Sequence, residues 1–185
     1  MKSAQVTLRG AGPLSQSAPL VTEKESKELH ADYEKRVWQE RAHTDENGYL
    51  FIPPMAFKNC LTSAAQYMGE QIPGKGKKTW TAKFKSGILV PAPLITDVKA
   101  EDIEGEWLFV PSDGKTGGGK RVWKRFPLIK KWTGQIEFYI MDEVITKDVF
   151  KKHLEQAGAF IGVGRFRPER NGYYGRFVVE NLTWS

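Results

Sequence analysis

Three stretches of the sequence concentrate basic residues and contain almost no acids. Residues 71–96 hold five lysines and no acid, residues 114–136 hold seven basic residues and no acid, and residues 165–176 hold four arginines and Glu169. We call these the first, second and third basic segments. Together they carry a net charge of +15, whereas the rest of the chain carries −9. A chain polarised in this way can present its basic segments to a polyanion.

Aromatic residues lie inside the same three segments. They are Trp80, Phe84, Trp123, Phe126, Trp132, Phe166, Tyr173 and Tyr174. Cations neutralise phosphates, and aromatic faces stack on exposed bases with about 1–3 kcal/mol per base. This mixture favours single-stranded nucleic acid over a duplex, whose bases are already stacked. The alternative is that the aromatics are core residues on strands and the lysines form a solvated face.

The third segment also contains glycines among its arginines. Glycine lets the backbone adopt positive φ and approach a ligand closely, and exposed amides beside arginines suit phosphate oxygens. A tight structural connection to the last strand would explain the glycines equally well. We predict a nucleic-acid-binding surface with these members: Lys75, Lys77, Lys78, Trp80, Lys83, Lys85, Lys120, Arg121, Trp123, Lys124, Arg125, Arg165, Arg167, Arg170, Tyr173, Tyr174 and Arg176.

Other chemistries find little support in the sequence. A lone cysteine, Cys60, excludes an internal disulfide and a cysteine-based zinc site, and three scattered histidines argue against a histidine-rich metal site. The stretch 162–167 begins like a dinucleotide fingerprint, but it lacks the third glycine and leads into a strand. Residues 74–78 lack the spacing of a phosphate-binding P-loop. We therefore expect no cofactor, no metal and no catalytic residue.

The chain of 185 residues is long enough for one domain with insertions. No apolar run approaches the roughly 18 residues of a membrane helix, and the opening MKSAQVTLRG lacks the apolar centre of a signal peptide. With its cysteine content, the sequence thus indicates a cytosolic protein without a membrane partner.

Hydrophobic periodicity predicts the elements that must position these residues. Strands are predicted at 5–9, 48–52, 87–91, 106–110, 121–129, 132–141 and 176–182. A polar helix is predicted from Thr22 to about Arg41, because Thr22 and Glu25 form a capping-box pattern. Core helices are predicted from Pro53–Pro54 to about Gly69 and after the cap residue Thr146.

The reduced order of these elements is strand, helix, strand, strand, helix, strand. That order predicts an α+β fold of the ferredoxin-like (RRM-like) type, an antiparallel sheet with two core helices. We predict a single domain over residues 1–185, with insertions at about 10–47 and 71–120. The fold hosts many functions, so it does not decide this one.

Four stretches of the chain together carry a family resemblance. They are VTLRGAGPLSQS (6–17), GYLFIPPMAFKNCLTSAA (48–65), RVWKRFPLIKKW (121–132) and AGAFIGVGRFRPERNGYYGRF (157–177). They resemble the RAMP superfamily of CRISPR-associated RNA-binding proteins, and the best match is the backbone subunit of CRISPR effector complexes, together with related proteins of phages and mobile elements. The last corresponds to the glycine-rich loop and final strand of that family, and the order of all four gives the resemblance its weight.

The resemblance implies subunits that stack into a helical filament along a single strand, usually guide RNA. It also implies a mobile "thumb" hairpin that pushes between nucleotides, for which residues 112–120 are the first candidate and residues 71–86 the second. The chain is shorter than many such subunits, and none of its residues matches a catalytic residue of the family.

We therefore expect a non-catalytic subunit that binds single-stranded RNA or DNA and oligomerises along it. The sequence does not decide between the two, because that depends on contacts to the 2′-hydroxyl. One alternative is a metal-independent endoribonuclease of the wider superfamily, with His30 or His43 transferring the proton. Another is a mobile-element structural protein or inhibitor that docks on a host complex. The main hypothesis requires the three basic segments to converge on a common groove.

Overall fold

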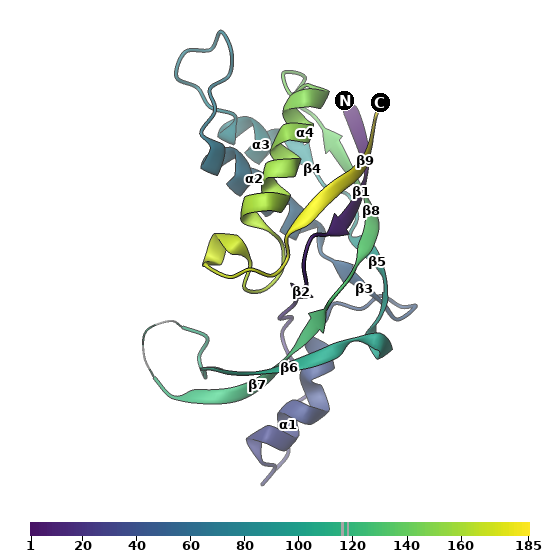
Figure 1. The fold of residues 1–185 in the computed structure, drawn as a ribbon, viewed down its shortest axis with the longest axis vertical. Coiled ribbons are helices and arrows are strands. Elements are labelled where there is room, and N and C mark those ends of the chain that lie inside the picture. The colour runs from purple at the N-terminus through teal and green to yellow at the C-terminus, as the bar shows by residue number, and fades with distance from the viewer. Residues whose placement is uncertain (116, 118) are drawn as a thin grey trace.

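The main sheet is antiparallel and contains both ends of the chain (Figure 1). The computed structural model describes residues 1–115, 117 and 119–185. The strand order is β3–β5–β8–β1–β9, and the short β4 pairs with the far end of β8. The strands are β1 (Lys2–Gly10), β3 (Tyr49–Ile52), β4 (Ile88–Leu89), β5 (Leu94–Lys99), β8 (Thr133–Ile140) and β9 (Phe177–Trp184).

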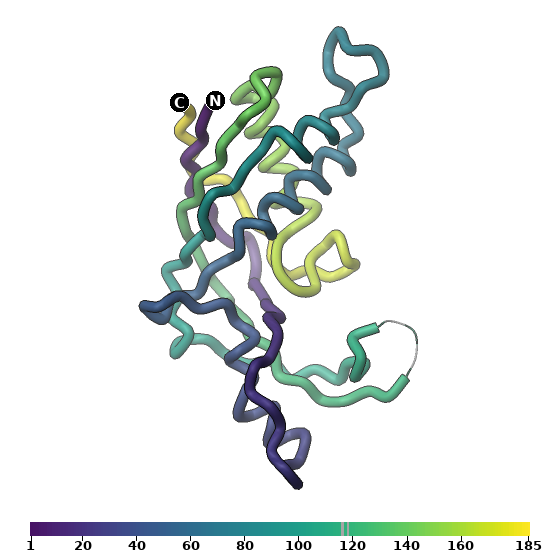
Figure 2. Tube along the Cα trace, turned by 180° about the vertical axis from the view of Figure 1, so that it is seen from behind, coloured from purple at the N-terminus to yellow at the C-terminus, as the bar shows by residue number. Residues whose placement is uncertain are grey.

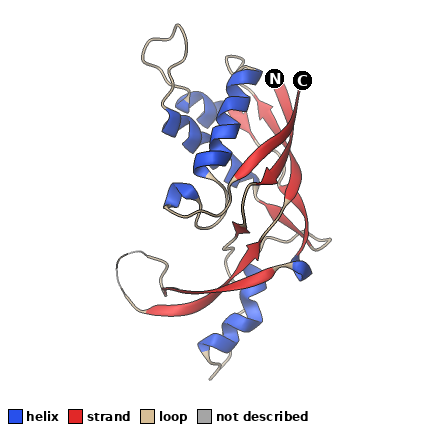
Figure 3. Cartoon of the chain, viewed as in Figure 1, coloured by secondary structure: helices blue, strands red, loops and turns tan. Residues whose placement is uncertain are grey.

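Three helices gather on one side of this sheet (Figure 3). They are α2 (Pro54–Met68), α3 (Thr81–Gly87) and α4 (Lys147–Gln156). Helix α2 begins with a proline and ends at Gly69 in the left-handed conformation, the usual asymmetry of helix ends. Helix α4 is capped by Thr146, whose hydroxyl accepts a hydrogen bond from the Val149 amide. Both caps confirm the prediction.

The core lies between the sheet and these helices. Phe138 on β8 packs edge-on against Phe57 of α2 and Phe150 of α4, with ring centroids 6.4 and 5.2 Å apart. All three side chains are fully buried, and Cys60 is buried on α2. Large aromatic side chains contribute most to such a core because each removes a large apolar area from water.

A second, smaller sheet extends away from the first. Its order is β2–β7–β6, formed by β2 (Leu14–Ser15), β6 (Glu104–Pro111) and β7 (Arg121–Ile129). Strands β6 and β7 form a long hairpin at the end of the molecule opposite to α3 (Figure 1). Its tip contains the predicted segment 112–120, of which Thr116 and Gly118 lie outside the described residues.

The α+β class and the antiparallel RRM-like arrangement are confirmed. Strands β9, β1, β8 and β4 lie side by side in the order that the ferredoxin-like pattern requires. The strand predicted at 87–91 is shorter than expected, because α3 precedes it directly and Pro91 and Pro93 follow it. The sequence prediction missed β5, although buried Leu94 and Thr96 alternate with exposed residues there.

The predicted start of the first helix is wrong. Helix α1 spans only His30–Val37 and continues into a 3₁₀ turn over Trp38–Arg41. Thr22 caps no helix, because its hydroxyl and its amide both donate to the carboxylate of Glu40. The capping-box pattern is thus satisfied by a residue far along the chain rather than by Glu25.

After α4 the chain makes a π turn over Ala157–Ile161 and returns to β9 through residues 162–176, which we call the glycine-rich loop. A short 3₁₀ turn, Pro168–Arg170, lies within it. No helix in the described part of the chain has the length and apolar character needed to cross a bilayer.

Candidate nucleic-acid interface

A cleft of about 1090 Å³ opens between the β6–β7 hairpin and the glycine-rich loop. Figure 2, which views the molecule from behind, shows these two segments facing each other. Residues 17–20 also line the cleft. Its cations are Arg41, Arg121, Lys124, Arg165 and Arg170, and its aromatics are Phe109, Phe126, Phe166, Tyr173 and Tyr174. The second and third basic segments therefore meet at one concave surface, as predicted.

Arg165 lies at the centre of this arrangement. Its guanidinium carbon sits 3.8 Å from the centroid of the Phe126 ring, a close cation–π contact. The Nε and Nη2 atoms are buried and have no hydrogen-bond partner among the residues that the structure describes. Burial lowers the pKa of Arg165, and the nearby carboxylate of Glu106 opposes this effect. The side chain thus offers buried donors without an acceptor, which is uncommon in folded proteins.

Backbone contacts hold Arg165 in this position. Its amide donates to the Ser15 carbonyl at 2.8 Å, and the amide of Gly175 donates to Pro13 at 2.8 Å. Gly164 has φ of +82°, and a Cβ there would lie 2.5 Å from the Ser15 carbonyl oxygen. Only glycine fits at that close approach. The glycine-rich loop is therefore fixed onto Pro13 and strand β2.

Tyr174 joins the glycine-rich loop to the hairpin. Its hydroxyl lies 2.8 and 3.0 Å from the two carboxylate oxygens of Glu106 on β6. Burial, and next the hydrogen bond to Glu106, raise the pKa of Tyr174 to about 12. The phenol therefore stays protonated and donates a hydrogen bond to Glu106. Tyr173 stacks on Tyr174 with ring centroids 5.2 Å apart and is 67% exposed at the cleft rim.

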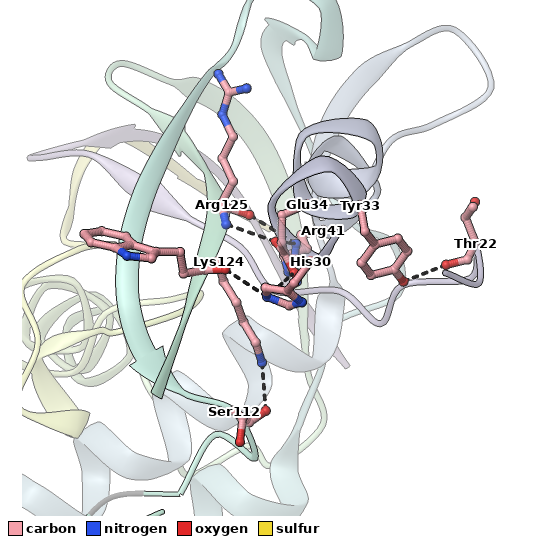
Figure 4. A network of polar contacts seen from close by, with 9 residues as sticks. Thr22, His30, Tyr33, Glu34, Arg41, Ser112, Lys124 and Arg125 are labelled. Carbon is pink, nitrogen blue, oxygen red and sulfur yellow. Dashed lines mark hydrogen bonds and ion pairs between the residues drawn. The ribbon is translucent and has the colours of Figure 1, made fainter. Parts of the chain in front are cut away.

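The base of the hairpin is held by a buried ion pair (Figure 4). Arg41 makes a bidentate contact with Glu34 at 2.8 and 2.9 Å, and both side chains are buried. Glu34 also accepts from the Arg125 amide at 3.0 Å, while Arg41 donates to the Arg125 carbonyl at 3.1 Å. Removing one partner of such a buried pair costs about 3–5 kcal/mol, because the other charge is left uncompensated.

These contacts cover the edge of β7 that does not face β6. Two further contacts lie along the same edge. Before Arg125, the Nε2 atom of His30 is 2.9 Å from the Trp123 carbonyl, and after Arg125 the Ser15 hydroxyl donates to the Pro127 carbonyl. Helix α1 therefore replaces a neighbouring strand along this edge and blocks edge-to-edge pairing. His30, a candidate for proton transfer, has a positioning contact here.

Alternation along β7 separates the predicted residues of the second segment. Lys124 and Phe126 line the cleft, whereas Trp123 and Arg125 point to the other face of the hairpin. The Arg125 guanidinium lies 4.4 Å from the Trp38 ring centroid. Trp123 is 55% exposed and packs against Phe109 at 5.3 Å. Arg121 lies at the outer part of the cleft, and Lys120 is exposed just before it.

Two arginines of the third segment lie outside the cleft. Arg167 pairs with Glu169 at 2.7 Å and lines an adjoining hollow of about 310 Å³ with His43. That hollow shares Ser17 and Arg165 with the cleft, so the two are neighbours. Arg176 donates to the Ala159 carbonyl and lines a separate hollow beside β9.

The first basic segment does not join the cleft, which corrects the prediction of one groove. The loop with Lys75, Lys77 and Lys78 lies at the opposite end of the long axis (Figures 1 and 2). Lys83 pairs with Asp142 at 2.7 Å, and Lys85 is exposed on α3.

Trp80 cannot stack on a base, because it is only 5% exposed and packs edge-on against the buried His153. Phe84 stacks on the ring of that histidine with ring centroids 4.3 Å apart. Trp132 of the second segment is buried as well. For these three aromatics the alternative of core residues is correct, although Trp80 and Phe84 belong to the start and body of helix α3 and not to a strand.

Sequence reasoning missed three contributions to the cleft: Arg41, Glu106 and residues 17–20. Glu106 follows the alternation of β6, which would place it on the same face as Leu108. No sequence signal places Arg41 there, because its position depends on the distant contacts with Glu34 and β7.

Comparisons with known proteins identify the fold. No family model and no curated protein matches the chain. A chain of the Type III-B Cmr-beta complex, bound to cognate target RNA, matches with TM-score 0.54 and 13% identity over 99% of this chain and 60% of that chain. Cmr6 from Pyrococcus furiosus matches with TM-score 0.53 and 14% identity over 97% of this chain and 99% of that one.

This chain thus spans less than two thirds of the Cmr-beta chain that it matches, but nearly all of Cmr6. At these identities the likeness is one of fold. It confirms the expected α+β fold, which this chain shares with these two Cmr proteins.

Proposed function

We propose that this protein is a non-catalytic subunit that binds single-stranded nucleic acid, preferentially RNA, in the cleft between the hairpin and the glycine-rich loop. The observation that carries the proposal is the guanidinium of Arg165, which lies 3.8 Å from the centroid of the Phe126 ring, lines the cleft and has two donors without an acceptor among the described residues. Phosphate oxygens are strong acceptors that match a guanidinium in geometry and charge.

The other cations of the cleft support this assignment. Arg121 and Lys124 donate to backbone carbonyls at 2.6 and 3.0 Å, so their charges are held in place without being neutralised by a carboxylate in those contacts. Arg170 lies across the cleft on the glycine-rich loop. Contacts of this kind bind any sequence and weaken steeply as salt rises, because binding releases counterions.

The aromatics favour a single strand over a duplex. Phe166 and Tyr173 are 50% and 67% exposed, so each presents a face to the cleft region that a splayed base can cover. Bases in a duplex are already stacked on each other and gain little from such a surface.

We further propose that the protein assembles with other subunits along the bound strand, with the β6–β7 hairpin as the thumb. The fold shared with Cmr6, and with a chain of a complex that was solved with target RNA, supports this. The hairpin extends away from the main sheet (Figure 1), which leaves it free to reach a neighbouring copy.

The binding proposal is tested by fluorescence anisotropy with a labelled RNA of mixed sequence over a range of salt concentrations. The Arg165→Ala variant should weaken binding by about tenfold or more and reduce the salt slope by about one phosphate contact, alike for all sequences. Arg9→Ala is the matched control, because Arg9 is exposed on β1 and pairs with Glu180.

Equal affinity of Arg165→Ala and the wild type, or wild-type binding that does not respond to salt, would contradict the proposal. The RNA should be intact after incubation. Cleavage that disappears in a His43→Ala variant would instead favour the endoribonuclease alternative, because His43 lines the hollow beside Arg165.

A further inference from the structure

Glu106 is a carboxylate in a cleft that otherwise collects cations. It is the one acidic side chain among the described residues that line the cleft. A carboxylate repels phosphate, so its presence weakens non-specific binding of any polyanion. Such a residue lowers the affinity of the site unless it forms a contact of its own with the ligand.

The structure leaves Glu106 able to form that contact. Both of its carboxylate oxygens lie within 3.0 Å of the Tyr174 hydroxyl, which has a single proton and can donate to one oxygen at a time. An ionised carboxylate has about four acceptor positions. Tyr174 therefore fixes the orientation of Glu106 and still leaves acceptor positions for a donor of the ligand.

Glu106 and Arg165 both lie next to the Phe126 ring. Glu106 is the direct cross-strand neighbour of Phe126, and Arg165 lies over the face of Phe126. A phosphate bound at Arg165 would therefore bring the adjoining sugar toward Glu106. The donor nearest to a backbone phosphate, present at every position of an RNA whatever its base, is the ribose 2′-hydroxyl.

We propose that Glu106, oriented by Tyr174, accepts a hydrogen bond from a ribose 2′-hydroxyl and makes the cleft selective for RNA over DNA. This inference rests on the proposed function, since it requires the strand to lie in the cleft. It assigns Glu106 as a specificity-determining residue and Tyr174 as its positioning residue.

The test compares the affinities of RNA, DNA and 2′-O-methyl RNA of one sequence at one salt concentration. The wild type should prefer RNA by about tenfold, because hydrogen bonds to charged groups are the stronger ones. The 2′-O-methyl strand keeps RNA geometry but lacks the donor, so it should bind like DNA. In Glu106→Gln, DNA should bind as well as in the wild type or better, and the RNA-to-DNA ratio should fall to about two or less.

Glu104→Gln is the matched control, because Glu104 is exposed on the same strand and pairs with Lys130 outside the cleft. Tyr174→Phe keeps the ring but removes the hydroxyl, and should lower the ratio less than Glu106→Gln does. Circular dichroism of each variant separates loss of selectivity from loss of fold.

The outcomes separate the two proposals. If neither strand binds, or if Arg165→Ala has no effect, the proposed function is wrong. If binding depends on Arg165 but the ratio in Glu106→Gln equals that of the wild type, only the role of Glu106 is overturned. The RNA-to-DNA affinity ratio can also be compared between strands whose bases carry amino groups and oligouridine. If Glu106→Gln changes the ratio for the amino-bearing strands but not for oligouridine, Glu106 contacts the base, which also overturns the inference.

Discussion

The first basic segment and the hairpin-loop cleft have similar compositions but different structures. Both combine lysines or arginines with aromatic residues and contain few acids. In the first segment Trp80 and Phe84 enclose His153 inside the core, and Lys83 is neutralised by Asp142. In the cleft Tyr173 and Phe166 are exposed, and two buried donors of Arg165 have no partner among the described residues.

The comparison shows that composition does not separate a core segment from a binding surface. What separates them is whether the aromatic faces and the charges are already used within the protein. Lys58 illustrates this, because it donates to the carbonyls of Phe84 and Lys85 at the end of α3 and so completes a helix end.

Trp80→Ala should lower the free energy of unfolding by about 3–5 kcal/mol, the usual cost of removing a large buried aromatic side chain. Urea unfolding followed by circular dichroism measures this. The folded fraction should bind RNA with wild-type affinity. A stable Trp80→Ala variant that has lost RNA binding would show that Trp80 contacts RNA, and would contradict its assignment to the core.

Tyr173→Ala should weaken RNA binding by about 1–3 kcal/mol, because an exposed aromatic at the cleft rim loses its stacking on a base. Its unfolding midpoint should stay at the wild-type value, since the side chain is largely exposed. Anisotropy titrations of Tyr173→Ala and Tyr173→Phe measure the effect, and the phenylalanine variant should bind normally. Equal weakening in both variants would argue for a role of the hydroxyl rather than stacking.

A smaller effect is expected from the pH dependence of stability. Burial lowers the pKa of His153 below its usual 6.5, so the unfolded chain binds the proton more readily. The contribution of the neutral, buried His153 to the free energy of unfolding is fully present above about pH 6.5. It is lost as the pH falls from there toward the lower pKa of the folded state. The fall should be shallower in a His153→Phe variant, and an identical slope in both proteins would contradict the assignment.

The smallest effect should come from the triple variant Lys75→Glu, Lys77→Glu, Lys78→Glu. These lysines lie at the far end of the molecule (Figure 1), and charges are screened beyond about 8 Å at physiological salt. The affinity for a short RNA should change by less than about threefold. A loss as large as that of Arg165→Ala would mean that the first segment also contacts the strand.

The sequence predicted those parts of the fold that local signals determine. Helix α2 is marked by Pro54 and Gly69, helix α4 by Thr146, and β8 by the alternation of buried Ile136, Phe138 and Ile140. The start of α1 was missed because the Thr22 hydroxyl bonds to Glu40 instead of a local amide. Tertiary contacts of that kind leave no local pattern.

The same limit applies to the cleft. The basic and glycine-rich composition of the third segment predicted Arg165, but it gave equal weight to Arg167, whose charge is paired with Glu169. Nothing in the sequence distinguishes Lys124, which lines the cleft, from Arg125, which lies on Trp38 at the other face, except the alternation of the strand. The contact between Glu106 and Tyr174 joins residues 68 positions apart and depends on the complete fold.

The central claim is that a single strand lies between the hairpin and the glycine-rich loop. Photo-cross-linking with RNA that contains 4-thiouridine, followed by mass-spectrometric mapping, tests it most directly. The account predicts cross-links to the exposed Phe166 and Tyr173, which decrease in Arg165→Ala. Cross-links confined to residues 71–85, with none in the cleft, would contradict it.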